Sequence, residues 1–178
     1  MAVAMTAAEF RTLREALGLT VEACCRIFAV ADRTIRRWDS GRLPVPDGVA
    51  RQLLQIDADF DRAARDTVRR ALDSGKIKHA VAVRYRTDEE LARYRPDMRL
   101  LGTQAHGALV DRGRRALVAA GLPAPRLVWL DPEDYDAWRG RRPDSEPLRV
   151  LWAASQLDAP PGTPAADSFC PPGTPAAD

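Results

Sequence analysis

The sequence contains few of the residues from which disulfide frameworks and metal centres are built. It has three cysteines and two histidines among 178 residues. Cys24 and Cys25 are adjacent and do not readily bridge each other, and neither they nor Cys170 belongs to a pattern spaced for zinc. We therefore expect a reducing, cytoplasmic compartment and no cofactor or metal.

Long apolar runs and a strong net charge are missing as well. No run approaches the length that spans a membrane, and the N-terminus lacks the basic and apolar segments of a secretory signal. The only lysines are Lys76 and Lys78, and the formal net charge is +2. Total charge therefore does not indicate a nucleic-acid partner, and the local distribution of arginine matters more. We expect a soluble protein that does not contact membranes.

The chain divides into three regions. Residues 1–56 have a compact helical pattern, and residues 57–156 combine a charged helix, two strand-like runs and further helices. Residues 157–178 are rich in Pro, Gly and Ala and contain the octapeptide PPGTPAAD twice, so we expect a disordered tail. A hydrophobic fraction of 46% permits a core. The expected fold is mainly α, with a small α+β C-terminal part.

Capping residues and apolar spacing predict three short helices in the first region. Thr6 and Glu9 have capping-box spacing at the start of the first helix. Thr20 is expected to cap the second helix, and a short turn through Ala29 leads into a third helix from about Asp32 to Ser40. The apolar residues at helical spacing are Phe10, Leu13, Leu17, Ala23, Cys24, Ile27, Phe28, Ile35 and Trp38.

The stretch LTVEACCRIFAVADRTIRRWDSGRLPVP, residues 19–46, resembles the helix-turn-helix of phage-repressor-type (Cro/C1-like) DNA-binding proteins. The chain departs from that pattern at Ala29, where Gly is usual in the turn, and we expect a slightly different turn geometry there. It also departs at Cys25, where Ala is usual at the tight contact between the helices. The matching residues are Leu19, Thr20, Cys24, Cys25, Phe28, Val30, Thr34, Ile35, Trp38, Asp39, Gly41, Arg42 and Pro46.

The resemblance implies that the third helix enters the major groove of double-stranded DNA. It gives base contacts to Arg33 and Arg37, because Arg favours the guanine edge, and a base or phosphate contact to Thr34. Asp32 could accept from a cytosine amine or cap the helix, and capping is the favoured interpretation. A solvated face is the alternative for these arginines. Phosphate contacts are implied for Arg36, Arg42, Thr20 and Val21.

Two further features of this resemblance are structural. Arg14 and Asp39 resemble a pair that forms a salt bridge in the family and holds the first helix to the third. Ile35 and Trp38 are expected to face inward, with Trp38 in the core rather than acting as a stacking platform.

The second region predicts a small α+β domain. Asp47 is expected to cap a fourth helix that extends to about Leu72. The alternating runs of residues 77–85 and 126–130 predict strands, separated by a helix over residues 102–120. Asp131 is expected to cap one further helix and Asp144 to start a last one. Apolar positions expected on these helices include Val49, Leu53, Leu54, Ile56, Leu109, Val110, Leu117, Val118, Leu148, Leu151 and Trp152.

Residues 128–155 resemble the small YdiL-like regulators, which include anti-CRISPR-associated (Aca) autorepressors encoded beside phage anti-CRISPR genes. The resemblance weakens over residues 57–99. It implies a C-terminal domain that dimerises the protein and places two recognition helices on an inverted-repeat operator, with half-sites ~34 Å apart. The matching residues are Asp134, Tyr135, Ala137, Trp138, Arg142, Asp144, Ser145, Glu146, Leu148, Arg149 and Trp152. The three aromatic residues among them are expected in the core, with an interface as the alternative.

No enzymatic activity is expected. His79 and His106 have no carboxylate or Cys at metal or triad spacing, and no glycine-rich segment has the residues of a P-loop. Arginines between residues 62 and 70 alternate with aspartates, which favours a solvated helix over an RNA-binding surface. We expect a dimeric, sequence-specific transcriptional repressor of its own gene. An antitoxin that binds a toxin protein and an RNA-binding translational regulator are the alternatives, and a small-molecule effector pocket is left open.

Overall fold

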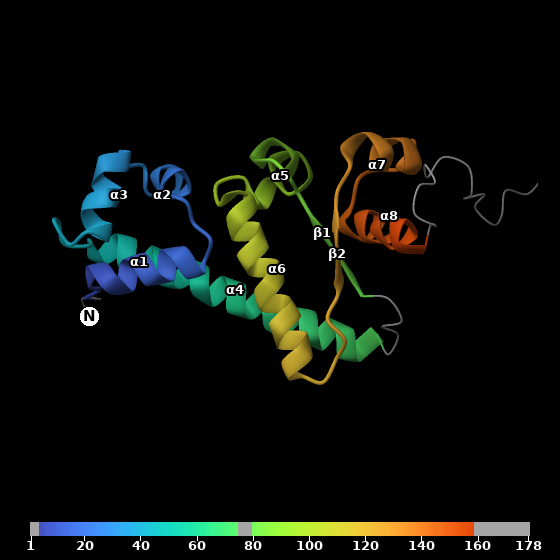
Figure 1. Cartoon of the computed structure of the whole chain (residues 1–178), viewed down its shortest axis with the longest axis horizontal. Coiled ribbons are helices and arrows are strands. Elements are labelled where there is room, and N and C mark those ends of the chain that lie inside the picture. Colours follow the sequence, from blue (N-terminus) through green and yellow to red (C-terminus); the bar gives the residue numbers. More distant parts are fainter. Residues whose placement is uncertain (1–3, 75–79, 159–178) are drawn as a thin grey trace, which may run out of the picture.

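The computed structural model describes residues 4–74 and 80–158. Helices dominate this part of the chain and one small sheet lies in its second half, which confirms the expected fold class (Figure 1). The helices are α1 (Ala7–Ala16), α2 (Val21–Phe28), α3 (Asp32–Asp39), α4 (Asp47–Ser74), α5 (Asp88–Tyr94), the 3₁₀ helix η1 (Pro96–Met98), α6 (Gly102–Ala119), α7 (Pro132–Arg139) and α8 (Glu146–Asp158). The strands are β1 (Val81–Arg84) and β2 (Arg126–Trp129).

Side-chain caps fix the starts of the first two helices. The Glu9 amide donates to the Thr6 hydroxyl, and the Thr6 amide donates to the Glu9 carboxylate at 2.7 Å, which confirms the capping box. The Thr20 hydroxyl accepts from the Ala23 amide and caps α2 as predicted. These bonds satisfy amides that have no partner inside the helix.

One long helix, α4, connects the two halves of the molecule. Its first turns bury Ala50 and Leu53 against α1–α3, and its later turns bury Phe60 and Ala64 beside α6 (Figure 1). The helix begins at Asp47 and extends two residues beyond the expected end at Leu72. Leu54, expected on its apolar face, is 42% exposed.

The sheet consists of two parallel strands joined by a helical crossover. β1 pairs with β2 in a register that sets Val81 opposite Arg126 and Arg84 opposite Trp129. α5, η1 and α6 form the connection, as a parallel pair requires. The expected strand over residues 126–130 is confirmed from Arg126 to Trp129. The one over residues 77–85 is confirmed from Val81 to Arg84, and its first three residues lie outside the described residues.

Aromatic side chains form the core of the second half. Tyr135 and Trp152 are buried and meet edge to face at 5.9 Å. Both keep a hydrogen bond, since the Tyr135 hydroxyl donates to Asp144 and the Trp152 Nε1–H donates to Asp134, each at 2.7 Å. The core prediction is therefore confirmed for these two residues, whereas Trp138 is half-buried and stacks on Tyr135.

The last helix starts differently from the prediction. Asp144 lies outside α8, which begins at Glu146, and the Ser145 hydroxyl accepts from the Leu148 amide in its place. Asp144 instead accepts from the Tyr135 hydroxyl and pairs with Arg149, so its carboxylate is committed to the core. The prediction that Val118 and Leu151 lie on the buried sides of their helices is also wrong, because both side chains are mostly exposed.

The predicted start of the tail at residue 157 is too early in the chain. Residues 157 and 158 still belong to α8, and residues 159–178 lie outside the described residues. Lys76, Lys78, His79 and Cys170 lie outside them as well. Within the described residues, none of the helices combines the length and the apolar character that a bilayer crossing requires.

Candidate nucleic-acid interface

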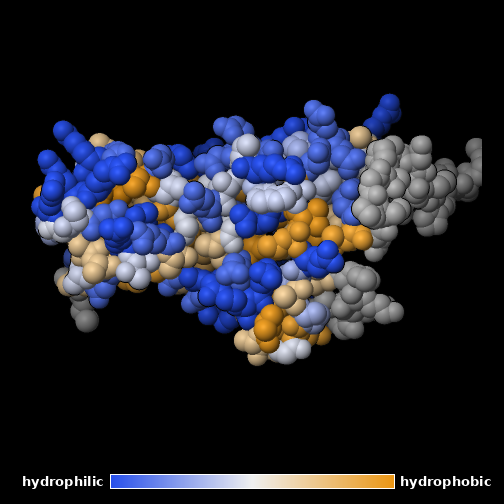
Figure 2. Space-filling view, viewed as in Figure 1, coloured by the Kyte–Doolittle hydropathy of each residue, from blue (hydrophilic) through white to orange (hydrophobic). Residues whose placement is uncertain are grey.

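Helix α3 separates an apolar face from a basic one. Ile35 is fully buried and Trp38 is 4% exposed, which confirms both as core residues. Arg33, Arg36 and Arg37 are exposed on the other side, where Figure 2 shows hydrophilic side chains projecting over this end of the molecule. The sequence forces this arrangement because residues three apart on a helix share a face.

Three aromatic rings hold α3 in place. Trp38 meets Phe10 of α1 at 5.9 Å and Phe28 of α2 at 6.4 Å, both in edge-to-face geometry. Phe10 and Phe28 are 6.5 Å apart, so each helix contributes one ring to the same cluster. Such pairs stabilise packing by roughly 0.5–1.5 kcal/mol beyond the area they bury.

A buried ion pair also connects α1 to α3. The Arg14 guanidinium donates to both carboxylate oxygens of Asp39, at 3.2 and 3.0 Å, and to the Leu19 carbonyl at 2.8 Å. The predicted Arg14–Asp39 pair is therefore confirmed. Because the fork also bonds the loop before α2, it fixes the position of all three helices relative to one another.

The turn between α2 and α3 keeps the conformation that glycine would adopt. Ala29 has φ 54° and ψ 44°, in the left-handed region. The expectation of a different turn geometry is wrong at this residue, since the alanine accepts the strained conformation instead. Of the two cysteines in α2, Cys24 is fully buried and Cys25 is half-buried against the core. Burial raises the pKa of the Cys24 thiol to about 12, so it is a packing residue.

Asp32 does not cap α3. The cap position is Ala31, which makes no side-chain hydrogen bond, and Asp32 is the first helical residue. Its carboxylate accepts from Arg36, four residues on, at 2.5 and 3.0 Å. Hydrogen bonding from Arg36 lowers the pKa of Asp32 below its usual value. The capping interpretation is wrong because a carboxylate on the first turn reaches the Arg36 guanidinium one turn further on.

Three arginines on this surface have no carboxylate partner. Arg33, Arg37 and Arg42 are exposed and form no ion pair within residues 4–74 and 80–158. Arg42 follows α3 in the loop before α4, and Arg33 and Arg37 are one turn apart on the helix. Their guanidinium groups are therefore available to an external anion or base edge.

The other predicted contact residues lie at helix starts. Thr20 and Val21 form the beginning of α2, where the Thr20 hydroxyl already accepts from Ala23. Thr34 is half-buried, and its amide donates to the Ala31 carbonyl. The structure thus brings all the predicted contact residues onto the α2–α3 unit and the loop that follows it.

The sequence pattern did not single out Glu22 as part of this surface. Glu22 lies in the first turn of α2, and a hydrogen bond from its own amide, followed by one from Thr20, lowers its pKa. It interacts electrostatically with both Asp32 and Arg36. The first turns of α2 and α3 therefore each carry one carboxylate, that of Glu22 and that of Asp32. The sequence offered a single indication of Glu22, namely that acidic residues are common in the first turn of a helix.

Arg26 ties the helix-turn-helix to the second half of the chain. Its guanidinium donates to the Asp88 carboxylate at 3.3 Å and to the Leu100 carbonyl at 3.4 Å. Asp88 also accepts from the Thr103 amide at 2.9 Å. Sequence reasoning could not find this contact because its partners lie more than sixty residues apart.

The described residues contain no group of three or more His, Cys, Asp or Glu side chains that could hold a metal.

His106, the histidine within these residues, is 3% exposed and meets Tyr85 edge to face at 5.1 Å. Burial, followed by repulsion from Arg95 and Arg84, lowers its pKa to about 3. It is therefore neutral at physiological pH.

The fold and this surface define a helix-turn-helix protein whose third helix, α3, carries exposed arginines. Residues 5–109 match the Aca2/YdiL-like family, which is a family of regulators rather than enzymes. The match covers more than half of the chain, and the protein belongs to this family. None of the curated proteins compared with the chain matches it.

The matched range differs from the one that the sequence resemblance emphasised. It includes residues 57–99, where the resemblance weakens, and it ends at residue 109. The tract of residues 128–155 lies outside the match, so its likeness to the family stays a prediction.

Proposed function

We propose that the protein is a sequence-specific DNA-binding transcriptional regulator that represses its own gene. The observation that carries this proposal is the exposed pair Arg33 and Arg37, unpaired with any described carboxylate, on a helix anchored by buried Ile35 and Trp38. A rigid helix with free guanidinium groups one turn apart suits the donor and acceptor pattern of the major groove.

The neighbouring side chains have distinct roles in this proposal. Arg33, Arg37 and Thr34 contact bases. Both carboxylate oxygens of Asp32 accept hydrogen bonds from Arg36. This pair orients the Arg36 side chain toward a phosphate, and it leaves the Asp32 carboxylate occupied. The remaining phosphate contacts come from Arg42 and from the α2 start, where Thr20 and Val21 lie at the positive end of the helix dipole.

We further propose that the regulator is a homodimer, joined through its second half. Leu127 and Trp129 share one face of β2 and are 44% and 49% exposed, with Arg84 and Arg86 over the Trp129 ring, and Leu151 of α8 is 60% exposed. Figure 2 shows hydrophobic surface over the part of the molecule that contains the strands and α8. An apolar face on an exposed strand supports a protein interface. Two recognition helices would then read the two halves of an inverted repeat.

The decisive experiment compares two double variants in a gel shift with the gene's own upstream DNA. Arg33→Ala with Arg37→Ala is expected to lower operator affinity about 100-fold or more, since each bidentate guanine contact contributes roughly 1–3 kcal/mol. Arg62→Ala with Arg69→Ala removes the same charge from exposed α4 positions and is expected to leave operator affinity nearly unchanged. Circular dichroism should show the same helix content in both.

Equal operator binding by the two double variants would contradict the assignment of α3 as the recognition helix. The gene's transcript serves as a second probe in the same assay. Tighter binding to the transcript than to the duplex would favour translational regulation instead.

A further inference from the structure

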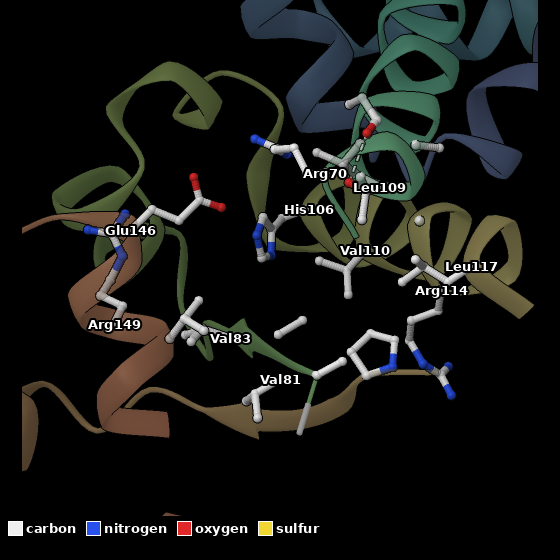
Figure 3. Close-up of a pocket in the computed structure, with 18 of the residues that line it drawn as sticks. Arg70, Val81, Val83, His106, Leu109, Val110, Arg114, Leu117, Glu146 and Arg149 are labelled. Carbon is white, nitrogen blue, oxygen red and sulfur yellow. Dashed lines mark hydrogen bonds between the residues drawn. The ribbon is translucent and has the colours of Figure 1, made fainter. Parts of the chain in front are cut away.

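A cavity of about 670 Å³ lies between α4, α6, β1 and α8 (Figure 3). Small-molecule sites in proteins typically enclose about 300–1,000 Å³. None of its lining residues belongs to α1, α2 or α3, so it is separate from the proposed DNA surface. The side chains of its apolar wall are Val81, Val83, Leu109, Val110 and Leu117.

Gly113 contributes to the size of this cavity. It is a buried residue of α6, and a Cβ built onto it would meet no atom within 4 Å. Glycine inside a helix lowers stability relative to alanine. No close neighbour requires the missing side chain here, so the effect of glycine is to leave space between α6 and the sheet.

The polar groups at the cavity are mainly cationic. Arg70, Arg95, Arg114 and Arg149 line it, together with one carboxylate, Glu146. Among these arginines, Arg95, Arg114 and Arg149 each pair with an aspartate, and their remaining N–H groups are not used by those bonds. Arg149 is itself 4% exposed, which places a buried arginine side chain at the wall of the cavity.

His106 adds an unused hydrogen-bonding atom. Figure 3 shows its ring projecting from α6 into the space above Val83. Its Nδ1 is buried and finds no hydrogen-bond partner among the residues that the structure describes, although buried polar groups in proteins are normally paired. A neutral imidazole can carry its proton on Nδ1 and donate it to an oxygen.

We propose that this cavity is a binding site for a small organic anion with an apolar body. The apolar body lies between α6 and β1, and the acidic group faces Arg149 and the Nδ1–H of His106. Glu146 disfavours a second acidic group at the α8 side, so the site selects a monoanion. This proposal does not depend on DNA binding, because α3 contributes nothing to the cavity.

A matched pair of fluorescent probes tests the proposal on the full chain. The first probe is 1-anilinonaphthalene-8-sulfonate, and the second is N-phenyl-1-naphthylamine, which has the same rings and no sulfonate. The sulfonate probe is expected to bind with a stoichiometry of one and at least about tenfold more tightly, because hydrogen bonds to charged groups are stronger than those between neutral groups. Absence of sulfonate-probe binding, or equal affinity for both probes, overturns the proposal.

Two leucine variants locate the probe. Gly113→Leu fills the cavity from α6 and is expected to reduce affinity for both probes at least about tenfold. Gly48→Leu makes the same change at an exposed α4 position with equally free surroundings, and its probe affinity should equal that of the unaltered chain. If Gly113→Leu does not fold, Gly113→Ala adds a single methyl and should still weaken binding several-fold. Equal affinity in the Gly113 and Gly48 variants overturns the proposal.

A third variant tests the polar anchor. His106→Phe keeps an aromatic ring against Tyr85 and removes the nitrogen atoms. It is expected to weaken binding of the sulfonate probe several-fold while leaving the uncharged probe unaffected. Equal losses for both probes would show that His106 acts only through shape, and would overturn its role as donor.

Discussion

At the scale of single residues, Ala29 holds a conformation that its side chain opposes. An L-residue with a Cβ is disfavoured in the left-handed region, and glycine is not. We expect Ala29→Gly to raise the free energy of unfolding by about 0.5–1 kcal/mol, after the extra entropy of glycine in the unfolded chain is subtracted. Urea denaturation followed by circular dichroism measures this.

Ala58→Gly is the control for that substitution. Ala58 is an exposed residue in the interior of α4, where glycine should lower the free energy of unfolding by about 1 kcal/mol. Opposite signs for the two changes support the left-handed turn. A destabilising Ala29→Gly variant would contradict it.

In the proposed function, Arg42 binds DNA phosphate and does not contact bases. It lies outside α3 and has no carboxylate partner within the described residues. Arg42→Ala is expected to weaken operator and unrelated DNA equally, and to reduce the slope of log affinity against log salt by about 0.9 for each phosphate that Arg42 neutralises. Fluorescence anisotropy at several salt concentrations measures this slope. An unchanged slope would show that Arg42 does not bind phosphate.

At the scale of elements, Gly18 sets how closely α6 approaches the helix-turn-helix. It has φ +65°, and a Cβ at this position would lie 2.5 Å from the backbone oxygen of Gln104. Gly41 has a similar φ of +73° but meets only the Ala7 methyl, at 3.5 Å. The two glycines therefore share the same conformational requirement and differ in the space around them.

We expect Gly18→Ala to lower the free energy of unfolding by about 3 kcal/mol or more, and Gly41→Ala by about 1–2 kcal/mol. The difference isolates the backbone clash, because both variants bear the same penalty for a Cβ at positive φ. Chemical denaturation measures both changes. Equal losses would mean that α6 can move away from the loop at little cost.

At the scale of the whole molecule, buried His106 makes stability depend on pH. Its pKa is about 3 in the folded chain and near 6.5 when unfolded. The unfolded chain therefore binds a proton between these values that the folded chain does not, and stability falls as the pH decreases from 6.5 towards 3. The expected loss from this residue is about 2 kcal/mol at pH 5.

His106→Phe is expected to flatten this dependence between pH 7 and pH 5. Thermal unfolding at several pH values measures it, and every other titrating group is common to both chains. The same pH dependence in both proteins would show that the pKa of His106 is the same in the folded and the unfolded chain.

The sequence by itself determined the local parts of the helix-turn-helix. The capping residues, the apolar spacing of Ile35 and Trp38, and the exposed arginines all act within a few residues of one another. The Arg14–Asp39 pair spans a longer distance, and it was found only because the motif resembles a known family. Asp32 was misinterpreted because capping and pairing with Arg36 are both local options for a carboxylate at that position.

Only the tertiary structure decided how the halves of the chain combine. The bond from Arg26 to Asp88, the close approach of Gly18 to Gln104 and the commitment of Asp144 to Tyr135 and Arg149 join residues that no sequence period relates. The cavity around His106 likewise depends on the spacing of α4, α6, β1 and α8. The spacing of apolar residues in the sequence predicts which side of a helix or strand is buried. Tertiary packing determines which elements contact one another and what space remains between them.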